Sequence, residues 1–362
     1  MNRETSIYLD ALRFAAAAVV FLTHVSGRRL TGGLFWQVGP YGSEAVTLFF
    51  VLSGFVIGYT TRRNRPAETY IVARTARIYS VALPALLLTF ALDSIGRALN
   101  PALYTESWGY VWDGRVSQFL RGALFLNQIW YADISPGSDL PYWSLGYEVW
   151  YYVIFGVAAF SRSRWRWPLL LGLLAFVGPC IAGMFPLWAL GFLAYRVSSR
   201  AALSPRTAAT MCFGAVAAWL AYETQAWMGG TRMMGVAPAF LGHPELAQSY
   251  LVATLFTIHL IGFHALAPAF GAVLTPFARP VRWIAGATFS LYLFHVPISQ
   301  FIASLMPWSS HSAAARIAVL IGTPLLVLAL AEVTERRKES WRRLVLMLLR
   351  YPSSFWSRAL PR

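Results

Sequence analysis

The chain of 362 residues is 57% hydrophobic and only 12% charged, and its formal net charge is +15. Because a soluble globular chain carries about 25% charged residues, this composition excludes a set of water-soluble domains and predicts a polytopic membrane protein. The basic residues stand in short groups between apolar runs rather than on one solvated face, so we expect no nucleic-acid partner.

Apolar runs of roughly 20 residues, the length that crosses a bilayer as a helix, recur along the whole chain. They predict an all-α fold with about ten transmembrane helices. The fifth and sixth runs are short and meet at Gly183, so they form either two tilted or broken helices or one re-entrant pair. The expected spans are residues 8–27, 41–61, 78–97, 143–160, 168–182, 184–197, 207–224, 249–268, 284–305 and 315–333.

The charges between these runs predict the orientation, since Lys and Arg collect in cytoplasmic loops. With the N-terminus inside, 22 of the 30 basic residues fall in inner segments. An even number of spans then returns the C-terminus to the same side, so we expect both termini to be cytoplasmic. Arg13 lies inside the first run and no small-residue cleavage site follows it, so no cleavable signal peptide is expected.

One outer segment, residues 98–142, contains no span, and a loop of this length is usually functional or disordered. At the other end, residues 336–362 interleave Arg with Trp and Leu, which predicts a basic amphipathic tail on the inner leaflet. We therefore expect one transmembrane domain over residues 1–335, followed by this tail. The outer segment is predicted to be an ordered cap because of its aromatic and acidic residues, Trp108, Trp112, Trp130, Tyr131, Asp133 and Asp139.

The first expected span contains three ionisable residues, Asp10, Arg13 and His24, and such residues within a span indicate function by default. Eleven positions separate Arg13 from His24, which leaves a rotation of about 20° and a rise of roughly 16–17 Å. Both side chains therefore face the same direction at two depths. Asp10 is within pairing distance of Arg13. A buried pair that only packs the bundle is the alternative, but a one-sided polar stripe favours a lined cavity.

Three further groups lie within expected spans or directly beside them. Glu148, near the outer end of the fourth span, is a carboxylate that needs a partner, and His24 lies at a similar depth. Ser53 stands beside a glycine, a pattern that favours helix packing. Arg74 and Arg77 share one helix face at the inner mouth of the third span, where they either set topology or clamp a phosphate.

The remaining signals are weaker. His295 lies in the middle of a span, close to a proline. Cys180 and Cys212 both lie in apolar runs, where two small buried side chains are expected rather than a disulfide or a metal site. The sequence has no zinc-protease motif, paired Cys-x-x-Cys, P-loop or glycine-rich dinucleotide motif, so we expect no metal site and no nucleotide hydrolysis.

Five segments taken together resemble the acyltransferase-3 family of membrane O-acyltransferases, over nearly the whole chain. Each motif alone is weak, but the order Arg-x10-His, Ser-Gly-Phe, Arg-x-x-Arg and Trp-Ser-Leu-x-x-Glu is specific. Two positions depart from the family pattern, because Thr47 stands where an acidic residue is frequent and Ser80 where a proline is frequent. The segments are YLDALRFAAAAVVFLTH (8–24), TLFFVLSGFVIG (47–58), RTARIY (74–79), WSLGYEVWYY (143–152) and SLYLFHVPI (290–298).

The resemblance implies an enzyme that moves an acyl group, commonly acetyl, from acyl-CoA to a hydroxyl of a sugar or another compound. It implies that the CoA phosphates bind at the inner mouth and that a neutral histidine takes the proton of the acceptor hydroxyl. The implied site residues are His24, Glu148 and Arg13 for catalysis, Arg74, Arg77 and Ser53 for the donor, and Asp10, Trp143 and His295 for substrate binding.

The preferred acceptor is a cell-surface polysaccharide or its lipid-linked precursor, and the expected location is the lipid bilayer of a bacterial cytoplasmic membrane. A transporter or flippase is the competing interpretation, because ten spans, an arginine within the membrane and broken helices also fit one. The absence of an internal repeat argues against a transporter. A sensor or scaffold leaves the polar stripe unexplained. The oligomeric state, and the choice between direct transfer and an acyl-enzyme, stay open.

Overall fold

The computed structural model describes residues 1–61, 66–105, 110–229 and 238–359, with side chains as far as residue 348. Every regular element among these residues is a helix, which confirms the predicted all-α class. The elements are α1 (Arg3–Val25), α2 (Arg28–Thr31), η1 (Trp36–Tyr41), α3 (Gly42–Thr60), α4 (Ala67–Leu99), η2 (Pro101–Leu103), α5 (Arg115–Ala123), α6 (Tyr142–Phe160), α7 (Arg166–Ser198), α8 (Pro205–Trp227), η4 (Ala239–Leu241), α9 (Leu246–Leu266), η5 (Ala267–Phe270), α10 (Gly271–Leu274), α11 (Ala278–Ala285), α12 (Thr288–Ser304), α13 (Ala313–Ile317), η6 (Ala318–Gly322), α14 (Thr323–Val333), η7 (Glu335–Arg337) and α15 (Lys338–Ala359).

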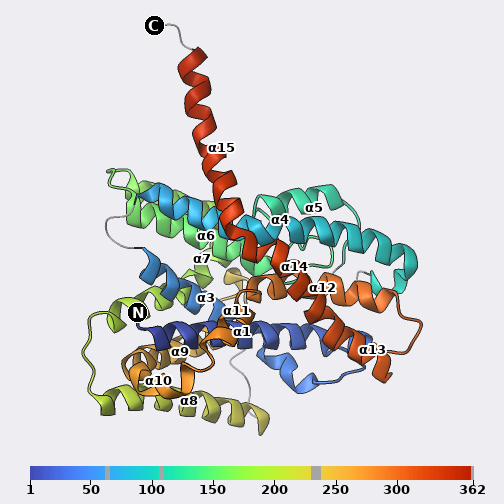
Figure 1. Cartoon of the computed structure of the whole chain (residues 1–362), viewed down its shortest axis with the longest axis horizontal. Helices are drawn as coiled ribbons and strands as arrows, with labels where there is room; N and C mark the ends of the chain where they lie inside the picture. Colours follow the sequence, from blue (N-terminus) through green and yellow to red (C-terminus); the bar gives the residue numbers. More distant parts are fainter. Residues whose placement is uncertain (62–65, 106–109, 230–237, 360–362) are drawn as a thin grey trace.

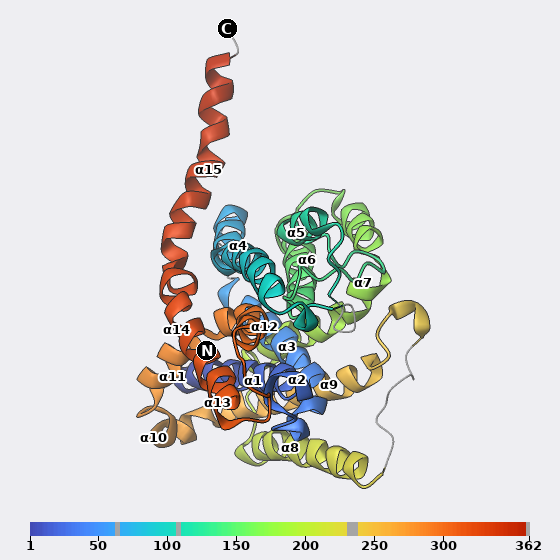
Figure 2. The ribbon, with the colours of Figure 1, turned by 90° about the vertical axis from the view of Figure 1, so that its right-hand side faces the viewer.

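The helices α1, α3 and α12 lie in the middle of the bundle (Figures 1 and 2). Both views place α8 at one edge and α4, α5 and α6 at the opposite edge. Helix α1 packs on α3 and α12, α3 packs along α7, and α12 packs against α4. The helix that carries the predicted polar stripe is therefore surrounded by other helices.

Six helical segments in the described part of the chain are long and apolar enough to cross a membrane. The helices expected at 143–160, 207–224 and 284–305 also form, as α6, α8 and α12, but they are not among these six. Their crossing of the bilayer stays a prediction, as does the cytoplasmic location of both termini. The six segments are Arg3–Val25, Trp36–Thr60, Ala67–Leu99, Arg166–Ser198, Leu246–Leu274 and Ala313–Leu348.

The fifth and sixth expected spans form one element, α7, which has a sharp break. The break lies at Gly178, whose φ of +82° favours glycine, and not at the later glycine where the sequence analysis placed it. Pro179 follows directly and cannot donate a backbone hydrogen bond. Trp130 of the outer segment packs on the break, and its backbone N–H donates to the Val177 carbonyl oxygen at 2.9 Å. The break therefore serves as the docking point of the outer segment.

The outer segment, residues 98–142, is folded over its described part, which contains η2 and α5. The guanidinium carbons of Arg97 and Arg115 lie 3.9 and 4.3 Å from the centre of the Trp112 ring, a cation–π arrangement. These contacts tie the segment to the end of α4. Trp108 lies outside the described residues.

A second tie joins the end of the outer segment to α4. The Asp93 carboxylate accepts both the N–H and the hydroxyl of Ser138. Next to it, Asp139 is fully buried and neither of its carboxyl oxygens has a hydrogen-bond partner in the described part of the chain. Burial, and then the neighbouring Asp93, raise the pKa of Asp139 well above its usual range. The location of this cap on the membrane surface stays a prediction.

Helix α15 leaves the bundle and projects beyond it (Figures 1 and 2). Its first turns pack on α4, where Val345 contacts Val72 and Ala76 and Trp341 covers this small cluster. Side chains after residue 348 lie outside the described residues. The amphipathic tail expected over 336–362 therefore stays a prediction.

The helices α3 and α7 approach so closely that each needs a glycine. A Cβ atom placed at Gly54 would lie 1.9 Å from the Trp188 carbonyl oxygen, and one at Gly191 would lie 1.8 Å from the Val51 carbonyl oxygen. The packing interpretation of the small residues on α3 is thus confirmed for Gly54. The close approach also brings the Trp188 indole N–H within 3.2 Å of the Ser53 hydroxyl, to which it donates.

Candidate active site

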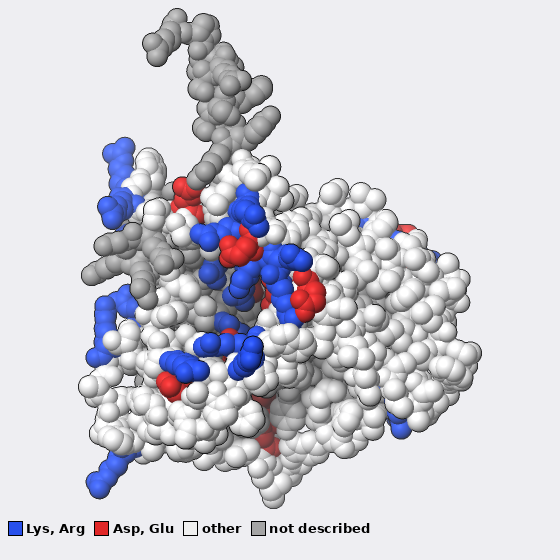
Figure 3. Space-filling view, viewed as in Figure 1, with Lys and Arg blue, Asp and Glu red and all other residues white. Residues whose placement is uncertain are grey.

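A cavity of about 480 Å³ lies among α1, α3, α4, α6, α11 and α12. We call it the basic cavity, because five Lys and Arg side chains line it against three Asp and Glu side chains. Figure 3 shows basic and acidic side chains gathered around a hollow, while most of the right-hand half of this face is uncharged. The charged lining residues are Arg13, Arg77, Arg282, Arg336, Lys338, Asp10, Glu148 and Glu335.

The ion pair expected within the first span forms. The Asp10 Oδ1 atom lies 3.6 Å from the Arg13 Nη1 atom, and both side chains line the basic cavity. The pair therefore faces open space and is not only a packing element. Arg77 of α4, expected to bind the donor, lines the same cavity.

Glu148 of α6 points toward α3 and not toward His24. One of its carboxylate oxygens accepts hydrogen bonds from the Ser53 hydroxyl, at 2.6 Å, and from the Tyr152 hydroxyl. Among the described residues, no hydrogen bond joins Glu148 to His24. Glu148 was expected to act in catalysis near His24; the structure instead brings it to Ser53 at the basic cavity.

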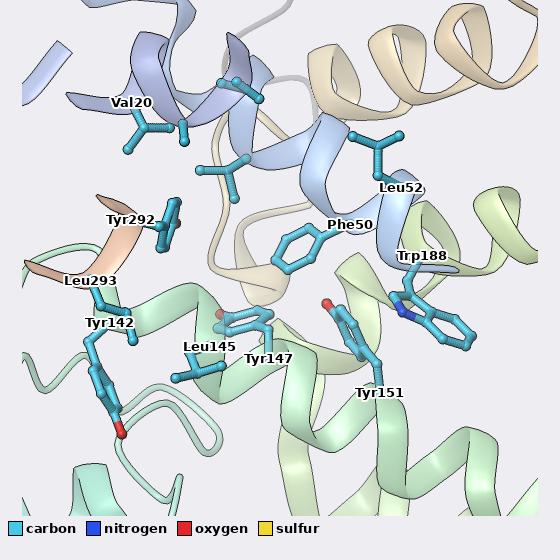
Figure 4. Close-up of a cluster of buried hydrophobic side chains, with 14 of the residues drawn as sticks. Val20, Phe50, Leu52, Tyr142, Leu145, Tyr147, Tyr151, Trp188, Tyr292 and Leu293 are labelled. Carbon is cyan, nitrogen blue, oxygen red and sulfur yellow. The ribbon is translucent and has the colours of Figure 1, made fainter. Parts of the chain in front are cut away.

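Aromatic side chains hold this network in place (Figure 4). The Phe50 ring of α3 lies edge-on to Tyr151, with 5.4 Å between ring centres, and stacks on Tyr147 at 6.4 Å. Trp188 of α7 lies beyond Tyr151. Because Tyr151 and Trp188 are fully buried, they leave little freedom to α6 and α7 at this level.

Arg74, one turn before Arg77 on α4, does not line the basic cavity. Its guanidinium carbon lies 5.8 Å from the centre of the Tyr152 ring. Its Nε and Nη1 atoms are buried, and neither has a hydrogen-bond partner in the part of the chain that the structure describes. Buried donors without a partner cost free energy. A hydrogen bond from these two donors to an anionic ligand would remove that cost. The two arginines expected to bind together therefore differ in their present surroundings.

A second cavity, of about 420 Å³, contains His24 of α1 and Trp143 of α6. We call it the histidine cavity. The cavity is also lined by the hydroxyl of Thr23, the carboxyl of Glu245 and the amide of Gln248. Burial raises the pKa of the Glu245 carboxyl. Thr23, Glu245 and Gln248 were not predicted, because nothing in their local sequence pattern distinguishes them from ordinary loop or helix-end residues.

The imidazoles of His24 and His295 are in contact. The distance from His24 Nδ1 to His295 Nε2 is 3.1 Å, and the ring planes are tilted by 51°. His295 is completely buried within α12, and its own Nδ1 lies 2.8 Å from the Leu291 carbonyl oxygen. His295 was expected to bind substrate, but it does not line the histidine cavity itself and contacts it only through His24.

The two cavities share a wall. Val46 of α3 and Tyr292 of α12 line both of them. The Tyr292 hydroxyl is hydrogen-bonded to the Ser144 hydroxyl at 2.6 Å. Since Val46 and Tyr292 line both cavities, a slender molecule that moved from the basic cavity to the histidine cavity would pass beside these two side chains.

Four charged residues of the basic cavity come from the last quarter of the chain and were not predicted. The Glu335 carboxylate accepts the N–H and the hydroxyl of Ser290, at 2.9 and 3.1 Å, where α12 begins. Arg336 donates to the Trp283 carbonyl at 2.8 Å. In sequence the three basic residues lie at span ends that were predicted to be inner, where topology alone explains them, and no local pattern marks Glu335. The four residues are Arg282, Glu335, Arg336 and Lys338.

Cys180 and Cys212 are buried and unbridged, as predicted. Within the described residues, no group of three or more His, Cys, Asp or Glu side chains is arranged to hold a metal ion.

A family model described as an acyltransferase domain matches residues 6–332 of this chain. The protein Acyltransferase MdmB of Streptomyces mycarofaciens is 33% identical to it over 154 residues, which are 41% of this chain and 37% of that protein. The chain thus matches little more than a third of the length of this curated relative. No solved structure matches the chain.

Proposed function

We infer the function from the family, because this chain belongs to the acyltransferase family whose domain model matches residues 6–332. The protein is an integral membrane O-acyltransferase that moves an acyl group, by preference acetyl, from acyl-CoA to a hydroxyl of a carbohydrate. The observation that carries the proposal is the pair of cavities that meet at Val46 and Tyr292, one of them basic and the other containing His24.

The basic cavity is the donor site. CoA carries several phosphate charges, and guanidinium groups bind phosphate with charge-assisted hydrogen bonds. Arg77 and Arg282 line the cavity, and the free donors of Arg74 lie one helical turn away. Arg13 remains paired with Asp10 and lines the path of the pantetheine arm. The thin arm passes between Val46 and Tyr292 and brings the thioester to His24.

The reaction at His24 is a base-assisted acyl transfer. An unprotonated imidazole nitrogen takes the proton of the acceptor hydroxyl as its oxygen attacks the thioester carbon. The new C–O bond forms, the C–S bond breaks, and the CoA thiolate takes the proton back from the imidazolium. An attack by the imidazole itself, giving an acyl-histidine that the acceptor then resolves, is the covalent alternative. Glu148 and Ser53 hold α6 and α3 together beside the thioester path.

The histidine cavity is the acceptor site. Trp143 offers an aromatic face, and Glu245, Gln248 and Thr23 offer groups that bind hydroxyls. This combination suits a sugar ring, which has apolar faces and hydroxyls at its rim. A cell-surface polysaccharide or its lipid-linked precursor is the preferred acceptor.

We further propose the orientation that the loop charges predict, with both termini in the cytoplasm of a bacterial inner membrane. The basic cavity then faces the compartment that contains acyl-CoA. The residues of α15 lie on the same side, as a basic tail.

The test is transfer by the purified protein. Radiolabelled acetyl-CoA is incubated with candidate glycans, and we expect label in a glycan product. His24→Ala should abolish this transfer, whereas His311→Ala, which alters an exposed histidine outside both cavities, should retain it. Full activity of the His24 variant would refute the base assignment.

The same experiment separates the enzyme from a transporter. If proteoliposomes move an unmodified glycan across the bilayer and no label enters it, the protein is a carrier and the proposal is wrong. Label that remains on the protein after acetyl-CoA alone, and that leaves on addition of the acceptor, identifies the covalent route.

A further inference from the structure

Two histidines from helices far apart in the sequence meet at the edge of the histidine cavity. His24 is near the end of α1 and His295 is in the middle of α12, and their nearest ring nitrogens are 3.1 Å apart. In each ring the Nδ1 atom also lies close to the carbonyl oxygen four residues earlier in the same helix, at 2.9 Å from Val20 and at 2.8 Å from Leu291. The same local geometry therefore occurs twice, in two helices that pack on each other.

The carbonyl contacts assign the ring protons. A carbonyl oxygen only accepts hydrogen bonds, so a neutral imidazole whose Nδ1 faces one carries its proton on Nδ1. His295 thus donates from Nδ1 to Leu291, and its Nε2 is an unprotonated acceptor. The His24 Nδ1–H faces this acceptor as well as the Val20 carbonyl. The Nε2 atom of His24 is then the unprotonated nitrogen, and no described residue forms a hydrogen bond with it.

We propose that His295 is the positioning residue of His24: its Nε2 accepts the Nδ1–H of His24, so that the His24 Nε2 lone pair is directed at the acceptor hydroxyl. His295 also receives the stronger hydrogen bond that His24 donates once it has become an imidazolium. This inference rests on the proposed function, because it deepens the role of His24 in the acyl transfer. The division of labour resembles that of a base and its orienting partner in acyl-transfer enzymes generally.

The surroundings of His295 support a fixed acceptor over a filler of space. Its side chain has 0% exposure, and the Phe21 ring stands edge-on to it with 5.8 Å between ring centres. A buried imidazole that only filled space would leave its second nitrogen without a hydrogen-bond partner, which is unfavourable. Here His24 supplies the partner of that nitrogen. The ring tilt of 51° suits a hydrogen bond between the ring edges and not face-to-face stacking.

The test compares two amides that differ by one methylene. The Gln side chain places its amide oxygen near the position of an imidazole Nε2 atom, whereas the Asn side chain ends near the position of Nδ1. His295→Gln therefore keeps an acceptor within reach of His24, and His295→Asn withdraws it while still offering a donor to Leu291. Both variants retain a polar side chain at the buried position, and thermal unfolding in detergent checks that both are folded.

The first readout does not depend on activity. Nitrogen-15 NMR of protein labelled at its histidines reports which ring nitrogen carries the proton, and the His24 signal is the one that disappears in His24→Ala. We expect the Nδ1–H form of His24 in the wild type and in both variants, because the contact with the Val20 carbonyl remains. The signal of the Nδ1 proton should lie further downfield in the wild type and in His295→Gln than in His295→Asn, where the second acceptor is withdrawn. The same proton shift in His295→Asn and in the wild type overturns the proposal.

The second readout is the division of the kinetic effect. General-base catalysis contributes about 10²- to 10⁴-fold, so loss of its positioning should lower kcat of His295→Asn by about 10- to 100-fold, with KM for acetyl-CoA changed less than twofold. His295→Gln should recover most of that loss. Equal losses in both variants, or a loss confined to KM, point to a structural role and refute the inference. Were His24→Ala to remain active, the proposed function would fail while the NMR result would still decide the hydrogen bond.

Discussion

The close contact between α3 and α7 allows a sharp test of how the site is held together. A methyl group at Gly191 would lie 1.8 Å from the Val51 carbonyl oxygen and 3.0 Å from the Phe55 nitrogen, both of them backbone atoms that cannot turn aside. Since a carbon and an oxygen atom need about 3.2 Å, Gly191→Ala must push the helices apart by more than 1 Å. Overpacking of this kind costs about 1–3 kcal/mol.

The same substitution elsewhere in α7 provides the control. Gly172 also lies in α7, and a Cβ atom there would meet no atom within 4 Å. Gly172→Ala should therefore stabilise the protein by about 1 kcal/mol, because alanine favours a helix more than glycine does. The two variants should differ by about 2–4 kcal/mol in the free energy of unfolding.

The assay is thermal unfolding in detergent, followed by acyl transfer at a temperature where both variants are folded. We expect a lower midpoint for Gly191→Ala and a weakened contact between Trp188 and Ser53, seen as a shift in tryptophan fluorescence. If Gly191→Ala and Gly172→Ala unfold at the same temperature, the contact between α3 and α7 does not control the position of Ser53, and the reasoning is wrong.

Three further predictions concern the cavities. Arg77→Ala should raise KM for acetyl-CoA by about 10- to 150-fold, the equivalent of one charge-assisted hydrogen bond of about 1.5–3 kcal/mol. Arg279 is an exposed arginine outside the basic cavity, so Arg279→Ala should leave this KM unchanged. Equal KM values for the two variants would mean that Arg77 only sets the topology. Val46→Trp should stop acyl transfer, while isothermal titration should show that acetyl-CoA still binds, and Val46→Ala should remain active. Transfer by the tryptophan variant would exclude a donor route between Val46 and Tyr292. Burial raises the pKa of Glu245. As the pH falls through that raised pKa, the carboxylate is protonated and loses a hydrogen-bond acceptor, so KM for the glycan should rise. This rise should be absent in Glu245→Gln, and a Glu245→Gln variant with the pH profile of the wild type would show that Glu245 does not belong to the acceptor site.

Local patterns in the sequence were enough to predict the polar stripe of α1. The eleven-residue spacing of Arg13 and His24 predicted one direction and two depths, and the structure places the two residues in two cavities that share a wall. The Asp10 partner followed from its three-residue spacing. Such predictions succeed because helical geometry alone fixes the relation between residues in one helix.

Contacts between distant segments could not be predicted in this way. His24 and His295 are 271 residues apart, and no periodicity relates them. The partner of Glu148 was sought at His24 because both were expected at a similar depth, but depth does not specify which neighbouring helix a side chain faces. The break in α7 was misplaced because a run of apolar residues does not reveal where Trp130 docks; the Gly178 and Pro179 pair was the available signal.

The shared wall of Val46 and Tyr292 has a consequence for the permeability of the membrane. Two cavities that approach each other within a bilayer would leak protons and ions if they joined and both held water, and here Val46 and Tyr292 line both of them. If the proposed donor arm displaces Tyr292, it fills the gap that it opens, so the substrate itself keeps the two cavities separate during each turnover. In the proposed orientation, an acyl group would then pass from the inner compartment to the outer one without a moment at which the membrane is open to ions.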